Sequence, residues 1–275
     1  MKVILLDVSG LLYRAYYSLS AEKFSRSDGL PTNAIYGLMN IIKKIIKDFK
    51  GYDIIACCDS RKESNFRLNI DKTYKQNRKS TPENLKKQFE YIEELIQSMN
   101  INIIKQNGYE ADDIISHICI NSDFQEIIIV SSDKDMNQLV NDKVKIYESK
   151  KKHLIDKEYI KEKYKIYPNQ FTFYQALLGD KIDNIEGIKG VGVKTAEKIV
   201  NQYENIEHFY NDINNKYINE FEKVKKNMKL VTLSNNIPNI VIQISKYDID
   251  SSKYYDFCKD MEFTSVLKKL STTKK

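Results

Sequence analysis

Three acidic residues each stand at the end of a short apolar run in this sequence. The runs are VILLD (3–7), YDIIACCD (52–59) and EIIIVSSD (126–133), and they end in Asp7, Asp59 and Asp133. Such runs predict buried β-strands. In a parallel sheet the carboxyl ends of the strands meet at one edge, where ligands bind, so we expect the three carboxylates to converge. Any one of them alone could instead cap a helix or form a turn.

Six more acidic residues strengthen the case for a metal site. Glu110 and Asp113 are three residues apart, as are Asp180 and Asp183, so each pair can share one face of a helix. Carboxylates crowded together repel one another unless cations neutralise them. Hard oxygen ligands suit Mg²⁺ or Mn²⁺, and two such ions are a known arrangement for phosphodiester hydrolysis. The predicted ligands are Asp7, Asp59, Glu110, Asp112, Asp113, Asp133, Asp135, Asp180 and Asp183.

The strand patterns alternate with helical patterns over the first 160 or so residues. Residues 33–49 and 81–99 have apolar residues at helical spacing, and VKIYES and KHLID suggest a hairpin. This alternation predicts an α/β domain with a mainly parallel central sheet flanked by helices. Beyond it the strand pattern fades into helical stretches. We predict an α/β domain at 1–165 and a helical domain at 166–275, packed together because no Gly-, Pro- or Ser-rich linker separates them.

The composition limits the class of protein. The chain has 44 basic and 38 acidic residues, and setting the nine acids aside leaves 29 acidic residues and a charge of +15. A basic body around an acidic pocket suits a nucleic-acid partner. Four cysteines without C-x-x-C spacing and three scattered histidines predict buried reduced thiols and no zinc site. No apolar stretch approaches the ~20 residues of a membrane span, so we expect an intracellular, soluble protein with no membrane partner.

Several stretches together resemble the 5′→3′ exonuclease domain of bacterial-type DNA polymerase I and the wider flap endonuclease family. They are LLYRAY, GLPTNAIYG, YKQNR, GYEADD, SSDKDM and LLGDKIDNIEGIKGVGVKTA, and they extend to about residue 200. The resemblance implies a PIN-like or resolvase-like nuclease core and a structure-specific 5′ nuclease, both exonuclease and flap endonuclease, with a two-metal mechanism. It also implies a role in DNA replication and repair, including RNA primer removal from RNA-primed DNA.

The resemblance also implies partners and a location. Because the chain stops at residue 275, we expect a standalone, monomeric form that works with a separate DNA polymerase and ligase on nicked, branched or 5′-flap DNA. The expected location is the bacterial cytoplasm or a DNA-containing organelle.

Individual roles follow from the same resemblance. The first metal group is implied to be Asp7, Asp59, Glu110, Asp112 and Asp113, and the second Asp133, Asp135, Asp180 and Asp183. Lys75, Arg78 and Arg14 match residues that engage the scissile phosphate, where positive side chains stabilise growing charge. Tyr74 matches an aromatic residue near the unpaired terminal nucleotides, on which a base can stack.

Residues of about 60–95 match a helical arch through which a 5′ single strand passes. Segment 61–79 has seven basic and two acidic residues and few apolar anchors, which fits a mobile basic gateway, although a plain flexible loop has the same pattern. Its candidate nucleic-acid contacts are Arg61, Arg67, Lys72 and Lys79.

The stretch GIKGVGVKTA (187–196) resembles the glycine-rich turn of a helix-hairpin-helix element. Gly187, Gly190 and Gly192 would let the backbone approach a DNA phosphate, and Lys194 would add a contact. In the family this element binds the duplex away from the cut, often with a K⁺ ion. A plain tight turn is the alternative.

Two other functions are compatible with parts of this pattern. A non-catalytic module that binds branched DNA could retain the fold, but the complete acid set argues against it. A PIN-like nuclease that cuts RNA would share the strand-end acids, but segment 180–196 and the basic arch argue against it. Cleavage of a DNA flap, compared with that of a single-stranded RNA, distinguishes the three.

Overall fold

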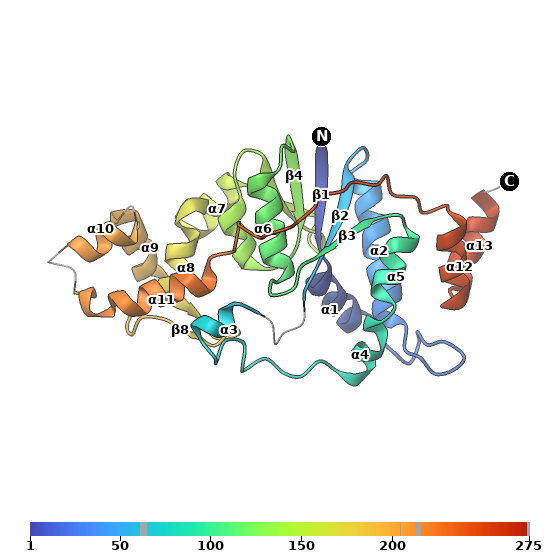
Figure 1. The fold of residues 1–275 in the computed structure, drawn as a ribbon, viewed down its shortest axis with the longest axis horizontal. Coiled ribbons are helices and arrows are strands. Elements are labelled where there is room, and N and C mark those ends of the chain that lie inside the picture. The colour runs from blue at the N-terminus through green and yellow to red at the C-terminus, as the bar shows by residue number, and fades with distance from the viewer. Residues whose placement is uncertain (61–64, 204, 213–215, 274–275) are drawn as a thin grey trace.

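The computed structural model describes residues 1–60, 65–203, 205–212 and 216–273. Its centre is a six-stranded sheet in the order β3-β2-β1-β4-β5-β6 (Figure 1). The strands are β1 (Lys2–Asp7), β2 (Asp53–Cys58), β3 (Asn102–Lys105), β4 (Glu126–Val130), β5 (Val144–Glu148) and β6 (His153–Ile155). Strands β1 to β5 are parallel, and β6 pairs with β5 in the antiparallel direction. The predicted α/β class and the predicted hairpin are both confirmed.

Helices cover both faces of the sheet, which is why its strands are continuous apolar runs. Along β1, Val3 and Leu5 pack into one core while Ile4 and Leu6 pack into the other. Helix α6 (Ala111–Asn121) contributes to the first core. Helices α1 (Val8–Ser18), α2 (Asn33–Asp48) and α5 (Ile92–Ser98) contribute to the second. The strand order reverses around β1 and β4, and such a switch point is where α/β sheets bind ligands.

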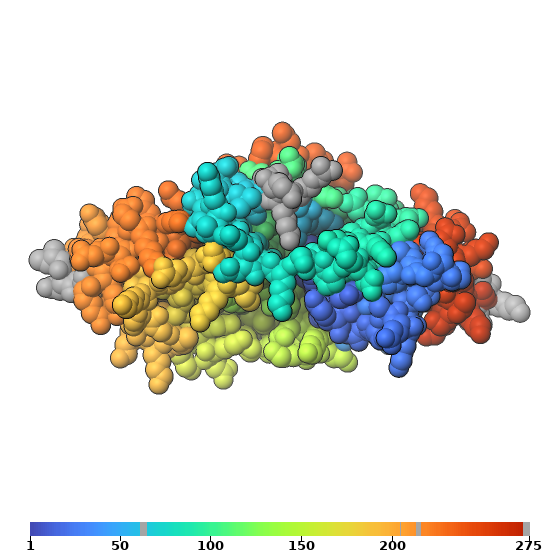
Figure 2. All heavy atoms as spheres, turned by 90° about the horizontal axis from the view of Figure 1, so that it is seen from below, coloured from blue at the N-terminus to red at the C-terminus, as the bar shows by residue number. Residues whose placement is uncertain are grey.

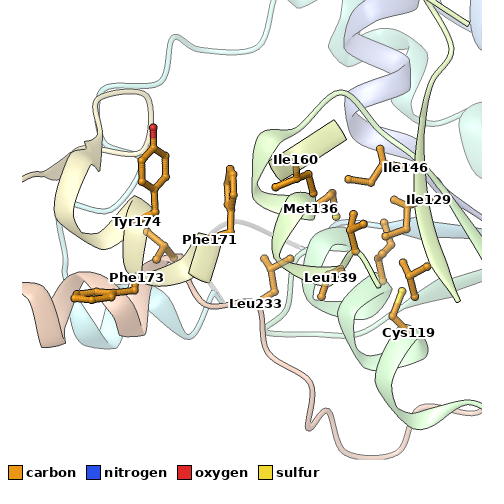
Figure 3. Packing of buried hydrophobic residues seen from close by; sticks show 14 of the residues in the cluster. Cys119, Ile129, Met136, Leu139, Ile146, Ile160, Phe171, Phe173, Tyr174 and Leu233 are labelled. Atoms are coloured by element: carbon orange, nitrogen blue, oxygen red, sulfur yellow. The ribbon is translucent and has the colours of Figure 1, made fainter. Parts of the chain in front are cut away.

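The region after the sheet is mainly helical, as predicted. Its elements are α7 (Lys157–Tyr164), η3 (Pro168–Gln170), α8 (Phe171–Leu178), β7 (Gly179–Asp180), β8 (Ile185–Glu186), α9 (Val193–Gln202), α10 (Ile206–Asn211), η4 (Ile218–Glu220) and α11 (Phe221–Val231). One apolar core runs from Ile129 of the sheet through Met136 to Phe171 and Tyr174 of α8 (Figure 3). The two regions are therefore packed together, as the absence of a linker suggested.

The last two helices lie at the opposite end of the molecule from α8–α11 (Figure 1). Residues 235–250 cross the α/β domain without helix or strand and lead to α12 (Ser252–Asp260) and α13 (Thr264–Thr273). The Asp248 N–H donates to the Met99 carbonyl (2.8 Å), and Tyr254 and Phe257 are buried in the core beneath α2 and α5. Residues 252–273, which the sequence assigns to the helical domain, thus pack on the α/β domain because their apolar face completes its core.

The single helix predicted over 81–99 is wrong. Two short helices, α4 (Glu83–Phe89) and α5, replace it. The buried Gln88 amide joins α4 to the start of α2, because its oxygen accepts from the backbone N–H groups of Ala34 (2.8 Å) and Ile35 (3.2 Å). Before α4, the chain passes through α3 (Arg67–Ile70) and a series of turns over residues 72–77, and we call residues 66–82 the arch segment. Of the helices in the described ranges, none has the length and apolar character that a membrane span requires.

Candidate active site

Side chains from four segments meet at the carboxyl edge of the sheet, around a cavity of about 390 Å³. The cavity is lined by Asp7, Gly10, Arg78, Ser132, Asp133, Lys134, Asp135, Asp180, Ile182 and Asp183. Figure 2 views the molecule from this side, and the arch segment runs across its middle from α3 to α4. The structure thus brings together five of the nine predicted carboxylates around one cavity and places a predicted arch cation, Arg78, beside them.

Asp7 and its neighbours form the most crowded part of the acid set. Asp7 ends β1 and caps α1: its Oδ1 accepts from the Gly10 N–H (3.0 Å) and its Oδ2 from the Ser131 hydroxyl (2.8 Å). Burial, together with the negative charges of Asp59 and Asp133, raises the pKa of Asp7 to about 6. Burial and the charges of Asp7 and Asp133 also raise the pKa of Asp112 well above its usual value. Three elements therefore aim carboxylates at one another without enough positive charge to balance them.

Asp135 and Asp180 also line the cavity. Asp135 accepts a hydrogen bond from the Gln175 amide, yet burial and the charge of Asp133 raise its pKa to about 7. Asp180 is different, because Lys134 Nζ lies 2.9 Å from its Oδ2. Burial acts to raise the pKa of Asp180, but this cation holds it below its usual value.

One lysine and one arginine of the arch segment form ion pairs with the acids. Lys75 Nζ pairs with the Glu110 carboxylate, and Arg78 Nη2 lies 2.7 Å from Asp183 Oδ1. Burial acts to raise the pKa of Glu110, but the positive charges of Lys75 and Arg67 outweigh it and hold this pKa below its usual value. The backbone supports this placement, because the Lys75 N–H donates to the Asp183 carbonyl (2.9 Å) and Lys75 has a left-handed φ of 58°. Lys75 and Arg78 therefore both lie among carboxylates, and Arg78 lines the cavity itself.

Arg67 is not an exposed nucleic-acid contact, and the sequence-based expectation for it is wrong. Its side chain is 1% exposed, and its guanidinium donates to both carboxylate oxygens of Asp113 (2.8 and 2.7 Å). It also donates to the backbone carbonyls of Leu230 (2.8 Å) and Thr232 (3.1 Å). A guanidinium engaged in this way has no accessible face for a phosphate.

Asp113 is not among the residues that line the cavity. It is fully buried, and the backbone N–H groups of Ser234 (2.8 Å) and Glu110 (3.2 Å) also donate to its carboxylate. Its place in the predicted metal set conflicts with this geometry, because every oxygen is already bound by Arg67 and the backbone. The nearby motif gives no signal for this, since Asp112 and Asp113 are identical residue types.

Tyr74 is buried rather than available for stacking. Its side chain is packed in the core, and its hydroxyl lies 3.3 Å from both Glu110 Oε2 and Asp183 Oδ2. It thus bridges an acid of each predicted metal group. The expectation that a base stacks on Tyr74 does not fit this burial.

The remaining predicted residues lie in less crowded surroundings. Asp59 is exposed at the end of β2, and its Oδ1 accepts from the Ala111 N–H (2.8 Å) at the start of α6. Arg14 is half-buried on α1. Burial lowers the pKa of its guanidinium, although the negative charges of Asp7 and Glu148 act to raise it. Lys72 and Lys79 are exposed, and Arg61 lies outside the described residues.

The glycine-rich hairpin has two kinds of glycine. Gly187 is placed by packing, because a Cβ there would lie 2.1 Å from the Leu178 carbonyl oxygen. Gly190 has a φ of +79° with open space around it, and Gly192 precedes α9 with open space as well. Lys194 is exposed in the first turn of α9. Gly190, Gly192 and Lys194 therefore remain predicted DNA contacts.

Sequence reasoning missed three residues that support the acids. Lys134 neutralises Asp180, the Ser131 hydroxyl orients Asp7, and the Gln175 amide orients Asp135. Only Lys134 had a visible signal, its position between two aspartates. The other two partners become evident only when the sheet and α8 are placed.

The donor set suits a hard divalent cation. Within the described residues no group of three or more His, Cys, Asp and Glu side chains is arranged to hold an ion, and the cations of Lys75, Arg78 and Lys134 balance part of the acidic charge instead. Burial, together with the charges of neighbouring carboxylates, raises the pKa of Asp7, Asp112 and Asp135. Carboxylate oxygens with uncompensated charge are the ligands that Mg²⁺ and Mn²⁺ prefer.

The same fold occurs in solved nuclease structures. The bacteriophage T5 5′-exonuclease with bound zinc matches with a TM-score of 0.70 and 24% identity, over 85% of this chain and 90% of that one. Human GEN1 in complex with Holliday junction DNA matches with a TM-score of 0.62 and 14% identity, over 95% of this chain and 68% of that one. At these identities the likeness establishes the fold alone.

The family follows from sequence comparison. Residues 2–165 match the model of the 5′-3′ exonuclease N-terminal resolvase-like domain, and residues 166–256 match that of the 5′-3′ exonuclease C-terminal SAM fold. A 5′-3′ exonuclease of Buchnera aphidicola is 36% identical over 92% of this chain and 92% of its own length. The DNA polymerase I of Caldicellulosiruptor bescii is 33% identical over 98% of this chain, which spans a third of that relative. The chain belongs to the 5′-3′ exonuclease family of nucleases, as its motifs predicted.

Proposed function

We propose that this protein is a metal-dependent, structure-specific 5′ nuclease that cuts DNA at 5′ ends and 5′ flaps. One observation carries the proposal: carboxylates from β1, from the segment after β4 and from the β7–β8 hairpin line one cavity at the sheet edge. Arg78 of the arch segment lines it with them and pairs with Asp183, and Lys75 of the same segment pairs with Glu110. Named relatives support it, among them the 5′-3′ exonucleases of Buchnera aphidicola and Aquifex aeolicus. The solved T5 flap endonuclease complex with DNA and metal ions has the same fold.

The proposed metal ligands are eight of the nine predicted acids, five of which line the cavity. They are Asp7, Asp59, Glu110 and Asp112 for one ion, and Asp133, Asp135, Asp180 and Asp183 for a second. When bound, such ions activate water and stabilise the leaving oxygen of a phosphodiester. The proposal of two Mg²⁺ or Mn²⁺ ions leaves Asp113 out, because Arg67 holds it.

The cationic residues have a second role when substrate enters. Lys75 and Arg78 pair with Glu110 and Asp183, and a phosphate at the cavity would compete with these carboxylates for the same donors. Charge-assisted donors of this kind stabilise charge that develops on a phosphate. Arg14, half-buried near Asp7, is proposed to assist them. Tyr74 is proposed to position Glu110 and Asp183 rather than to stack on a base.

The wider biological role is proposed from the family. The exposed turn of Gly190 and Gly192 with Lys194 would bind duplex DNA away from the cut, with K⁺ as a candidate ion there. Lys72 and Lys79 would contact the displaced strand. Removal of RNA primers in replication and repair, action as a monomer, and work beside a DNA polymerase and a ligase complete the proposal.

Cleavage of a 5′-flap duplex in Mg²⁺ and in EDTA tests the function. We expect metal-dependent product near the junction and no product with the Asp59→Ala variant. Tight flap binding without product in Mg²⁺ or Mn²⁺ would identify a branched-DNA binding module instead. Faster cleavage of a single-stranded RNA than of the flap would favour an RNA-directed nuclease.

A further inference from the structure

A second cavity, of about 470 Å³, lies between the base of the arch and the helical region. Its lining residues are Phe66, Ile70, Ile206, Lys225, Met228, Lys229, Thr232 and Ser234. It shares no residue with the acid cavity. Arg67 links the two, because its guanidinium binds the Thr232 carbonyl in this wall and lies 3.5 Å from Glu110 among the acids. We call this second cavity the α3–α11 groove.

The floor of the α3–α11 groove is apolar and its rim is basic. Phe66, Ile70 and Met228 are half-buried, and Lys225 and Lys229 are exposed one turn apart on α11. The other two basic residues in the middle of α11 are paired, Lys223 with Glu186 (2.9 Å) and Lys226 with Asp71 (2.7 Å). In the described part of the chain, Lys225 and Lys229 form no ion pair. The groove therefore offers two uncompensated positive charges above an apolar surface.

We propose that the α3–α11 groove binds a short stretch of single-stranded nucleic acid. Bases would lie against Phe66, Ile70 and Met228, and the phosphates would meet Lys225 and Lys229. A single strand exposes apolar base faces that a duplex keeps stacked, and basic grooves with an aromatic residue are the usual binding surfaces for it. The two lysines are about 6 Å apart along the helix axis, which suits neighbouring phosphates of an extended strand.

The position of the groove favours a nucleic acid over an acidic peptide. This step rests on the proposed function: a 5′ strand passing beneath the arch segment from the acid cavity meets α3, and α3 forms one wall of the groove. Figure 1 shows α3 and α11 side by side at this end of the arch segment, and the two helices are in contact. The groove would thus hold the displaced strand after it leaves the site of cleavage.

Binding in EDTA, where no cleavage occurs, tests the proposal directly. The probe is a fluorescent oligothymidylate of about 12 nucleotides, within the usual site size of single-strand binding proteins. The variant is Lys225→Glu with Lys229→Glu. The control is Lys253→Glu with Lys259→Glu, the same charge change on exposed lysines of α12 at the far end of the molecule. Thermal denaturation of both variants checks that they fold.

We expect the groove variant to bind the oligothymidylate about tenfold more weakly. The slope of log K against log salt should also fall by about 1.4, the value for two phosphate contacts on a single strand. The control should bind like the wild type. Equal affinities of wild type and groove variant overturn the proposal.

Two further probes separate base contacts and peptide binding. An abasic strand of the same length lacks the bases, so the wild type should bind it more weakly than it binds oligothymidylate. The Phe66→Ala variant should bind the two strands with nearly the same affinity. Equal binding of both strands to wild type overturns the assignment of bases to the apolar floor. The second probe is a peptide that contains Asp and Leu. Weaker binding of this peptide, but not of oligothymidylate, by the groove variant would identify a protein partner and overturn the proposal.

Failure of this inference is distinguishable from failure of the proposed function. Flap cleavage in Mg²⁺ with unchanged oligothymidylate binding by the groove variant overturns the groove and leaves the nuclease function intact. No cleavage by wild type, with strand binding lost in the groove variant, overturns the nuclease proposal and supports the groove as a single-strand site.

Discussion

Arg67 and Asp113 form a fully buried, bidentate ion pair that joins the base of the arch to the acidic helix α6. The guanidinium lies 2.7 and 2.8 Å from the two carboxylate oxygens, and the exposed fractions of the two side chains are 1% and 0%. The same guanidinium binds carbonyls at the end of α11. Three segments that are distant in sequence therefore share one charged anchor beside the acid cavity.

Removing Arg67 should destabilise the protein strongly. Arg67→Ala leaves the Asp113 carboxylate buried without its cation, which costs about 3 to 5 kcal/mol of unfolding free energy. Urea denaturation in EDTA measures this. The matched control is Arg26→Ala, which removes the surface pair with Asp28 and should change the stability much less than Arg67→Ala does. Similar losses for the two variants would contradict the structural role of Arg67.

Asp59 and Asp113 should respond differently to neutralisation. Asp59→Asn removes an exposed ligand, so we expect no cleavage, unchanged stability within about 1 kcal/mol and normal flap binding. Asp113→Asn leaves Arg67 buried without its counter-charge, so stability should fall while the folded variant still binds Mn²⁺. Urea denaturation and Mn²⁺ titration followed by electron paramagnetic resonance give both readouts. If the folded Asp113→Asn variant lost an Mn²⁺ site, Asp113 would have to be counted as a metal ligand.

Metal-free stability should fall as pH rises. The pKa of Asp7 is about 6 in the folded protein against 3.8 as its ordinary value, so the folded state binds more protons between these limits and loses stability as pH increases through them. The loss is on the order of 3 kcal/mol, and the raised pKa values of Asp112 and Asp135 act in the same direction. Urea denaturation in EDTA from pH 4 to 8 measures this dependence.

The Asp7→Asn variant is the control for this pH dependence. It cannot titrate at position 7, so its stability should vary less with pH than that of the wild type. Mg²⁺ should restore wild-type stability more at pH 8 than at pH 5, because ionised carboxylates bind the ion. Superimposable pH profiles of wild type and Asp7→Asn would show that Asp7 does not carry the effect.

Lys75 should matter for the chemical step more than for binding. Lys75→Met removes a buried cation beside Glu110, and we expect kcat for flap cleavage to fall about 100-fold. Lys79→Met, an exposed change in the same segment, should alter affinity slightly and leave kcat nearly unchanged. Single-turnover cleavage at saturating enzyme separates the two effects. Equal rates for Lys75→Met and Lys79→Met would remove Lys75 from the catalytic set.

The sequence was sufficient to predict the sheet and the convergence of its strand-end acids. Asp7 and Asp133 follow continuous apolar runs, and parallel strands bring such ends together whatever the loops do. The burial of Arg67 could not be predicted in this way. A run of basic residues gives every member the same pattern, and only the backbone of α11 and the N-terminal turn of α6 decide which side chain is enclosed.

Local pattern also failed to predict two other features of the fold. Residues 81–99 have helical spacing throughout, but Gln88 binds the first turn of α2, and the helix is divided after Phe89. The return of α12 to the α/β domain is similar. The core that it completes could not be identified from the sequence.

Lys134 should compete with a divalent ion for Asp180. Its ammonium lies 2.9 Å from Asp180 Oδ2 inside the acid cavity, and an ion that uses this carboxylate must displace it. Lys134→Met should therefore tighten Mn²⁺ binding about fivefold, the equivalent of about 1 kcal/mol for a partly exposed pair. Lys181→Met is the control, because Lys181 is exposed next to Asp180 and forms no ion pair within the described residues. Mn²⁺ titration of both variants measures the difference. Weaker binding by Lys134→Met, or an equal gain in both variants, would mean that Lys134 supports the site rather than competing for it.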